Sequence, residues 1–246
     1  ERLLTTFDER SQTNQINANA GIAPVEVDQE VFDLITRAQK IANLTQGAFD
    51  LSYGSLDKRL WNFDQEMTSL PDPMEMAKSV RLIDYQAIEL DAANQTVFLR
   101  NKGMRIGFGG IGKGYAADRA KSLLVNLGFQ HGVVNASGDM SAWGLNERGL
   151  AWQVAIVDPD DPKKTIAHFD LTNAAVATSG NYEKYVMIAG KKYSHTINPR
   201  TGYPIQGIKS VSVFAPVAEL ADALTTPIAV MGVEVGLDLV NQLNGI

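Results

Sequence analysis

The stretch GFGGIGKGYAADRAKSLLVNLG, residues 107–128, joins an apolar segment to a helical one through a glycine-rich turn. Met104 to Phe108 predict a β-strand, and Tyr115 to Leu127 have helical spacing that ends at Gly128. Such a turn presents backbone N–H groups and a helix N-terminus, which bind phosphate groups in many proteins. The residues alone leave one alternative open: the glycines only let helix and strand pack closely.

The same turn nearly matches the P-loop pattern G-x-x-x-x-G-K-[ST], with Lys113 at the lysine position. Gly114 stands where that pattern needs a hydroxyl to bind Mg²⁺. The substitution argues against a P-loop NTPase.

Outward from this stretch, the strongest helical pattern begins after Asp28, a potential N-cap, and ends near Gly47. Glu1 to Phe7 is interpreted as the tail of a helix, and Ser11 to Ala23 as an Asn-rich loop. A helix is expected from about Ala221 to the end, and the polar stretch from Asn62 to Pro73 is expected to be irregular.

Strands are predicted between these helices at 87–90, 96–99, 132–135, 152–157, 175–178, 185–189 and 210–215. The chain shows no regular strand-helix alternation and no short repeat, so we predict an α+β fold with mixed or antiparallel sheets. No linker divides the chain, and residues 1–246 are expected to form one domain, with two interlocked halves as a variant of that arrangement.

Composition excludes several classes of function. The 246 residues are 45% hydrophobic with a net charge of −6, which gives no basic footprint for nucleic acid. The absence of cysteine excludes disulfides, thiolate metal sites and a cysteine nucleophile. The longest apolar runs fall short of the roughly 18–20 residues of a transmembrane helix, and no signal-like segment opens the chain.

Two groups of polar residues could carry chemistry. Asp222 and Thr226 would share one helix face and offer the oxygen ligands that Mg²⁺ prefers, although such a pair is more often a cap and a solvated side chain. Pro227 also allows a helix that starts at Thr226. His195, in the turn 193–202, could act as a general base or merely be hydrogen-bonded there.

Two further turns, 135–139 and 178–182, are rich in small polar residues that suit close approach by a ligand. They contain the candidate contacts Asp139 and Ser179.

Taken in order, these segments resemble the ApbE family of flavin transferases from about Leu4 to the end. Ser11 with Asn17, and Gly47-Ala48-Phe49-Asp50, match its early motifs. The later motifs D-L-G-x-I-x-K-G-Y-A-x-D, N-x-G-G-D, S-H-I-x-x-P-x-T-G-x-P and D-A-L-[ST]-T correspond to residues 107–118, 135–139, 194–204 and 222–226. The order of the motifs is more specific than any one of them.

The resemblance implies a Mg²⁺-dependent enzyme that cleaves FAD, transfers FMN to a threonine of an acceptor flavoprotein, such as a respiratory redox-complex subunit, and releases AMP. It implies that His195 and Asp222 are catalytic and that Asp222, Thr226 and the Gly110 carbonyl bind the metal. The implied flavin and phosphate contacts are Phe7, Ala48, Phe49, Asp50, Gly107, Lys113, Asp139, Ser179 and Ile208. An FAD pyrophosphatase and a flavin carrier without turnover remain alternatives.

The chain departs from the family pattern at three positions: Gly107 replaces an Asp, Pro227 replaces a small residue, and Phe7 stands where Tyr is common. Both ends are expected to be short relative to the family, with a strand before Glu1 and more strand after Ile246. The resemblance further implies a periplasmic protein that, at full length, is held at the membrane by a lipid on an N-terminal cysteine.

Overall fold

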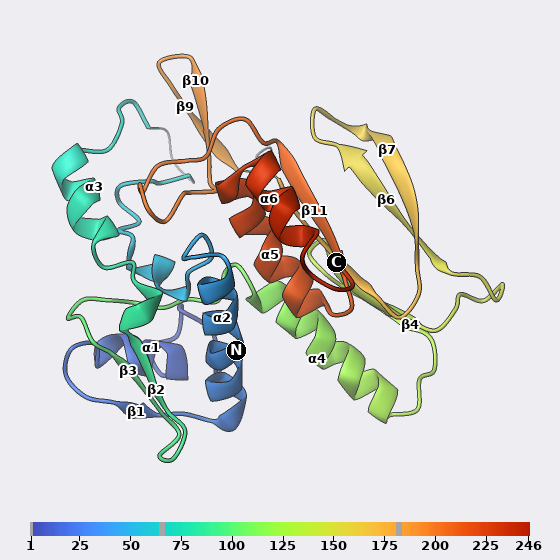
Figure 1. Cartoon of the computed structure of the whole chain (residues 1–246), viewed down its shortest axis with the longest axis horizontal. Coiled ribbons are helices and arrows are strands. Elements are labelled where there is room, and N and C mark those ends of the chain that lie inside the picture. The colour runs from blue at the N-terminus through green and yellow to red at the C-terminus, as the bar shows by residue number, and fades with distance from the viewer. Residues whose placement is uncertain (1, 64–66, 181–183) are drawn as a thin grey trace. The chain divides into compact units, whose positions relative to one another are not determined.

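The computed structural model describes residues 2–63, 67–180 and 184–246 (Figure 1). The chain forms two compact units, each built from two segments of sequence. Unit 1 contains Glu1–Gly109 and Lys184–Ile205, and unit 2 contains Gly110–Glu183 and Gln206–Ile246. Both units combine helices with antiparallel strands, so the predicted α+β class is confirmed. No described helix has both the length and the apolar character needed to cross a membrane.

Unit 1 is built on a long helix, α2, and a three-stranded antiparallel sheet of order β1-β3-β2. A separate hairpin joins β9 to β10. The elements of the unit are α1 (Gln12–Ala18), β1 (Val25–Glu26), α2 (Gln29–Leu44), η1 (Leu51–Ser55), α3 (Pro73–Val80), η2 (Tyr85–Ala87), β2 (Ile88–Asp91), β3 (Thr96–Leu99), β9 (Tyr185–Ile188) and β10 (Lys191–Ser194).

Helix α2 confirms the strongest helical pattern of the sequence. It begins directly after Asp28 and ends three residues before Gly47. The apolar residues along one side of α2 are buried, and Val31, Leu34 and Ile35 are inaccessible to solvent. This is the pattern expected of a helix that packs one face on a core. The predicted pair of strands at 87–90 and 96–99 is confirmed as β2 and β3.

The N-terminal predictions are wrong. Residues 2–7 form turns instead of a helix tail, and Glu1 lies outside the described residues. The segment Ser11 to Ala23 is not a loop throughout, because it contains helix α1, with Ser11 as the N-cap that accepts a hydrogen bond from the Asn14 amide. The Leu3 carbonyl accepts hydrogen bonds from the amide and the hydroxyl of Thr13 in α1. These bonds take the place of the bond that Leu3 would accept within a helix.

Met104 to Phe108 do not form the predicted strand. The Asn17 side chain pairs with the backbone of Ile106, donating to its carbonyl over 3.1 Å and accepting from its amide over 2.7 Å. Ser55 Oγ makes the same two kinds of bond to the backbone of Arg105. Side chains thus satisfy an extended segment that would otherwise need a neighbouring strand.

Unit 1 also contains a helix that the sequence analysis missed. Asp72 caps α3 by accepting from the amides of Met74 and Glu75, and Pro73 occupies the first turn. The stretch from Asn62 to Pro73 is otherwise irregular where described, and 64–66 lie outside the described residues.

Unit 2 contains a four-stranded antiparallel sheet of order β11-β8-β5-β4 and a separate pair, β6 and β7 (Figure 1). Helix α4 packs against β4 and β5, helix α5 packs against β8 and β11, and the two helices contact each other. The elements of the unit are α4 (Gly112–Asn126), β4 (Gly132–Ala136), β5 (Asp139–Trp143), β6 (Trp152–Asp158), β7 (Asp161–Leu171), β8 (Ala175–Gly180), β11 (Ser210–Ala215), α5 (Ala218–Met231) and α6 (Val233–Val240).

All five strands predicted after residue 130 are confirmed within one to two residues at each end, whereas β5, β7 and β10 were missed, as was β1. Strand β8 continues through Gly180, so the predicted turn 178–182 is strand in its first part, and Asn181 and Tyr182 lie outside the described residues. Most of β7 is exposed along both faces, so it lacks the apolar alternation that reveals a half-buried strand.

Two helix boundaries in unit 2 differ from the prediction. Helix α4 begins at Gly112, three residues before Tyr115. Helix α5 begins at Ala218 and runs through Pro227, so the alternative of a helix that starts at Thr226 is wrong. The predicted single C-terminal helix is divided at Gly232, whose φ of 88° ends α5 before α6 begins.

Candidate functional site

The glycine-rich turn places the first turn of α4 against α5. The Gly114 amide donates a hydrogen bond to Asp222 Oδ2 over 3.0 Å. A Cβ at position 114 would lie 2.1 Å from the Ala218 carbonyl oxygen and 2.8 Å from the Asp222 Cβ. Glycine is therefore required here for close packing.

Asp139 and Lys113 form an ion pair beside this contact. Lys113 Nζ lies 2.7 Å from Asp139 Oδ2, and Asp139 is 1% exposed whereas the Lys113 side chain is 43% exposed. Asp139 begins β5 directly after a tight turn, and Lys113 lies in the first turn of α4. Each residue was predicted as a separate ligand contact, and the structure brings the two side chains together.

Asp222 is 4% exposed, and its surroundings disfavour ionisation of its carboxyl group. Burial, reinforced by the nearby Asp139 carboxylate, raises the pKa of Asp222 to about 6. The Gly114 amide and the Lys113 ammonium act in the opposite direction without overcoming burial. Two neighbouring carboxylates beside a single lysine form a place where a bound cation would stabilise the ionised forms.

Helix α5 carries the second predicted metal residue. Because the helix is continuous, Thr226 follows Asp222 by four residues and lies on the same face, half-buried. Thr225, one position earlier, is fully buried and joins two elements, since its Oγ1 donates to the Asp222 carbonyl and lies 2.8 Å from Ser179 Oγ on β8. Ser179 is therefore engaged with α5, and Thr225 is a contact that the sequence analysis did not assign.

The donor set of unit 2 fits a hard divalent cation. Among the described residues, no group of three or more His, Cys, Asp or Glu side chains could by itself hold a metal. Carboxylate and hydroxyl oxygens are nevertheless the ligands Mg²⁺ prefers, and Mg²⁺ usually takes only one or two carboxylates and completes its shell with water and substrate phosphates. Gly110, the third predicted ligand, lies in the turn that precedes α4 and could offer its carbonyl.

Unit 1 contains the remaining acidic and aromatic candidates. Asp50 is half-buried and accepts from the Ser52 amide, the Ser52 hydroxyl and the Tyr85 amide. Its burial outweighs these bonds and raises its pKa. Ala48 and Phe49 are buried in the core, whereas Phe7 is 91% exposed, with Lys58 Nζ 5.5 Å from its ring centroid.

Gly107 lies in unit 1 and donates its amide to the Leu51 carbonyl over 3.0 Å. A Cβ at this position would meet only Thr6 Cγ2, at 3.8 Å, and the backbone is not left-handed. A side chain is therefore sterically acceptable here. Ile208, another predicted contact, is half-buried in unit 2 just before β11.

His195 follows strand β10 in unit 1. Its backbone amide donates to the Lys184 carbonyl over 3.0 Å, and its Nδ1 lies 3.2 Å from the same oxygen. A carbonyl can only accept, so Nδ1 carries the proton in the neutral ring and Nε2 keeps its lone pair. This tautomer suits a general base that acts through Nε2.

The turn after His195 is held by hydrogen bonds to its backbone groups. The Trp61 indole donates to the Gly202 carbonyl over 2.7 Å, and Ile197 pairs with Pro204 in an antiparallel bridge. Ser194 Oγ, next to the histidine, is buried and has no hydrogen-bond partner among the described residues.

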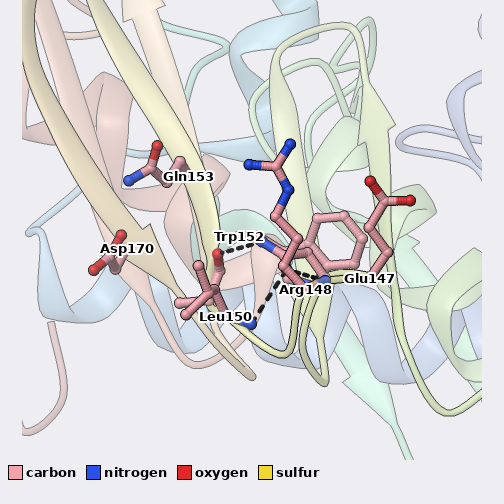
Figure 2. Close-up of a pocket in the computed structure, with 8 residues that line it drawn as sticks. Glu147, Arg148, Leu150, Trp152, Gln153 and Asp170 are labelled. Atoms are coloured by element: carbon pink, nitrogen blue, oxygen red, sulfur yellow. Dashed lines mark hydrogen bonds between the residues drawn. The ribbon is translucent and has the colours of Figure 1, made fainter.

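A pocket of about 560 Å³ lies elsewhere in unit 2, at the base of the β6–β7 pair (Figure 2). It is lined by Asn146, Glu147, Arg148, Leu150, Ala151, Trp152, Gln153 and Asp170. The Trp152 indole is turned to the Trp143 carbonyl, to which it donates over 3.2 Å. The lining does not include Asp222, Asp139 or Lys113, so the pocket is not part of the predicted site.

Solved structures of flavin transferases share this fold. The ApbE protein of Thermotoga maritima matches with a TM-score of 0.89 and 35% identity, over 98% of this chain and 78% of that one. The apo form of the Pseudomonas stutzeri flavinyl transferase ApbE matches with a TM-score of 0.85 and 28% identity, over 98% and 75%. The fold is thus that of the flavin transferase class.

Sequence comparison agrees. A Treponema pallidum protein named FAD:protein FMN transferase is 33% identical over 261 residues, which cover the whole of this chain and 72% of that protein. A Salmonella typhimurium protein of the same name is 31% identical over 98% of this chain and 70% of its own length. The ApbE family model matches residues 1–246, and the chain belongs to the ApbE family.

Proposed function

We propose that this protein is an FAD:protein FMN transferase that cleaves the FAD pyrophosphate and moves the FMN half onto an acceptor protein. The observation that carries the proposal is the buried pair Asp222 and Asp139, with Lys113 and the Gly114 amide in contact with it. Several relatives bear the name of this activity. An ordinary core would not retain two carboxylates with this little compensation, which supports a functional role.

The residues that would hold Mg²⁺ are Asp222, Thr226 and the Gly110 carbonyl. The ion, when bound, would neutralise charge on the pyrophosphate and so reduce its repulsion of a nucleophile. The continuous helix α5 supports this assignment by placing Asp222 and Thr226 on one face. The same ion would relieve the unfavourable burial of Asp222.

Lys113 and the amides of the first turn of α4 would bind the phosphate oxygens. The N-cap residue Ile111 makes no side-chain capping bond to the Gly112 and Lys113 amides, whereas the Gly114 amide is bonded to Asp222. The Asp139 carboxylate fixes the direction of the lysine. Asp139 and Ser179 would therefore act mainly by orienting Lys113 and α5.

His195 would act as the base. A threonine Oγ of the acceptor attacks the FMN phosphorus, the bond from that phosphorus to the bridging oxygen breaks, and AMP leaves with the bridging oxygen. The hydroxyl proton passes to His195 Nε2, which the bond at Nδ1 leaves free to accept it. The products are a phosphoester-linked FMN and AMP.

Phe7, Ala48, Phe49, Asp50, Gly107 and Ile208 are proposed to contact the flavin nucleotide. Ala48 and Phe49 are buried in this conformation, while the exposed Phe7 ring can stack. Location in the periplasm, a lipid anchor on the full-length protein and an acceptor in a respiratory redox complex are also proposed, on the resemblance to the ApbE family alone.

One assay tests the proposal. The protein is incubated with FAD and Mg²⁺, with and without an apo-flavoprotein whose mature form carries FMN on threonine, and AMP is measured. Release that depends on the acceptor supports a transferase. Release without acceptor would make the protein an FAD pyrophosphatase, and no release under either condition would leave a flavin carrier.

A further inference from the structure

Asp118 lies one helical turn after Gly114 in α4 and makes two hydrogen bonds to other elements. Its Oδ1 accepts from Ser141 Oγ on β5 over 2.9 Å. Its Oδ2 accepts from the Glu219 amide, at the N-terminus of α5, over 2.8 Å. The Asp118 carboxylate therefore joins α4 to β5, which carries Asp139, and to α5, which carries Asp222.

The bond to Glu219 replaces a local cap. Val217, the N-cap residue of α5, makes no side-chain capping bond, so Asp118 supplies from α4 what the helix lacks in its own sequence. A carboxylate at a helix N-terminus also interacts favourably with the helix dipole. Asp222 follows Glu219 by three residues, within the turn that this cap secures.

The bond to Ser141 secures the other acidic residue. Ser141 is fully buried and lies two residues after Asp139 on the same strand, so both side chains are on the same side of β5. On α4, Lys113 and Gly114 contact Asp139 and Asp222 respectively. Both carboxylates are thus held directly by the first turn of α4 and indirectly by Asp118 in the next turn.

We propose that Asp118 is a positioning residue that fixes Asp222 and Asp139 relative to the first turn of α4. It contacts neither carboxylate and acts through the α5 N-terminus and through β5. The expected effect of Asp118 on metal binding rests on the proposed function. Its role in fixing the two carboxylates does not, because that role applies to the metal-free protein. Outer partners of metal ligands typically change metal affinity by about 10- to 100-fold when removed.

The first test measures hydrogen exchange of backbone amides in the metal-free protein. Asp118→Ala should reduce protection at Glu219, its direct partner, and also at Gly114, whose amide is bonded to Asp222 and not to Asp118. Asp118→Asn should restore both, because its amide oxygen can accept from Glu219 while its NH₂ donates to the Ser141 hydroxyl. Lost protection at Glu219 with unchanged protection at Gly114 would reduce Asp118 to a local cap and overturn the proposal.

The second test measures Mg²⁺ binding by calorimetry at a temperature where all variants are folded. Asp118→Ala should weaken binding about tenfold, Ser141→Ala should weaken it less, and Asp118→Asn should remain near the wild type. Val154→Ala is the matched control, because it removes buried methyl groups from the β6 side of the same unit without touching these bonds. Equal weakening by Val154→Ala would mean that general destabilisation explains the result and would contradict positioning.

The two failures are distinguishable. A wild type that releases no AMP from FAD would contradict the proposed function, yet the exchange at Gly114 would still decide the role of Asp118. An active wild type whose Asp118→Ala variant keeps its Mg²⁺ affinity and its Gly114 protection would overturn the role of Asp118 alone.

Discussion

Gly114 and Asp222 meet where α4 contacts α5, with the glycine amide donating to the carboxylate over 3.0 Å and no room for a side chain. The same glycine thus allows the close packing of the two helices and bonds to the Asp222 carboxylate. Any larger residue would have to move α5 away from α4, and Asp222 with it.

Gly114→Ala should therefore destabilise the protein and impair metal binding together. The added Cβ would lie 2.1 Å from a backbone oxygen, which cannot yield as a flexible side chain does. Overpacking of this kind typically costs about 1–3 kcal/mol or more of unfolding free energy, measurable by urea denaturation. Gly109→Ala is the control, because no atom lies within 4 Å of its added Cβ, and equal losses in both variants would contradict this explanation.

The metal-free protein should lose stability as the pH rises through the range from about 4 to about 6. The pKa of Asp222 is raised to about 6 in the folded state, above its value of about 3.9 in the unfolded chain, so the folded form binds more protons in that window. The stabilisation that protonated Asp222 provides is fully present below the pKa of the unfolded chain and is lost as the pH rises through the pKa of the folded state. Thermal unfolding at a series of pH values measures it.

Asp222→Asn should remove this pH dependence and stabilise the metal-free protein at pH 8 by roughly 1–3 kcal/mol. The amide oxygen can still accept from Gly114, so packing is preserved. Asp238→Asn, on the exposed side of α6, is the control and should leave the profile unchanged. A wild-type profile that is retained in Asp222→Asn would show that another group causes the dependence.

His195→Ala should reduce FMN transfer by roughly 10²- to 10⁴-fold, the usual contribution of a positioned base, while FAD binding persists. The bond from Nδ1 to the Lys184 carbonyl leaves Nε2 as the acceptor. Single-turnover rates and FAD titration separate the two effects. If the variant loses FAD binding instead, His195 is a ligand contact or a structural residue.

Gly107→Asp should strengthen FAD binding severalfold. The family pattern has a carboxylate at this position, and one hydrogen bond to a ligand is worth about 0.5–1.5 kcal/mol net. The backbone here is not left-handed, and an added Cβ has space, so the variant should fold. Gly107→Ala adds the Cβ without the carboxylate, and equal affinities of the Asp and Ala variants in calorimetry would show that the missing carboxylate does not limit binding.

Periodic patterns in the sequence predicted the elements that bury one apolar face. The helical spacing of Val31, Leu34 and Ile35 predicted α2, and a run of β-branched and apolar residues predicted β11 with both ends correct. Elements stabilised by side-chain bonds to distant backbone could not be predicted this way. Helix α1 depends on Ser11 as its cap and on Asn17, which satisfies the backbone of Ile106, 89 residues away.

For the site, the order of the motifs indicated candidate segments but did not reveal the contacts between their residues. Lys113 and Asp139 were predicted as separate ligand contacts, and only the structure shows them as a pair. The roles of Gly114 and Asp118 depend on the packing of α4 against α5, which no local pattern encodes. The glycine at the P-loop hydroxyl position argues against a P-loop NTPase but does not by itself indicate the contact with α5.

We propose that Asp222 belongs to a metal site that supports transfer of FMN from FAD. The most direct measurement is FMN fluorescence on an apo-flavoprotein acceptor, together with AMP release, for the wild type and Asp222→Ala across a Mg²⁺ titration. We expect Mg²⁺-dependent labelling with matching AMP release by the wild type and none by the variant at any Mg²⁺ concentration. Undiminished labelling and AMP release by a folded Asp222→Ala protein would show that Asp222 is not a ligand of a metal needed for the reaction.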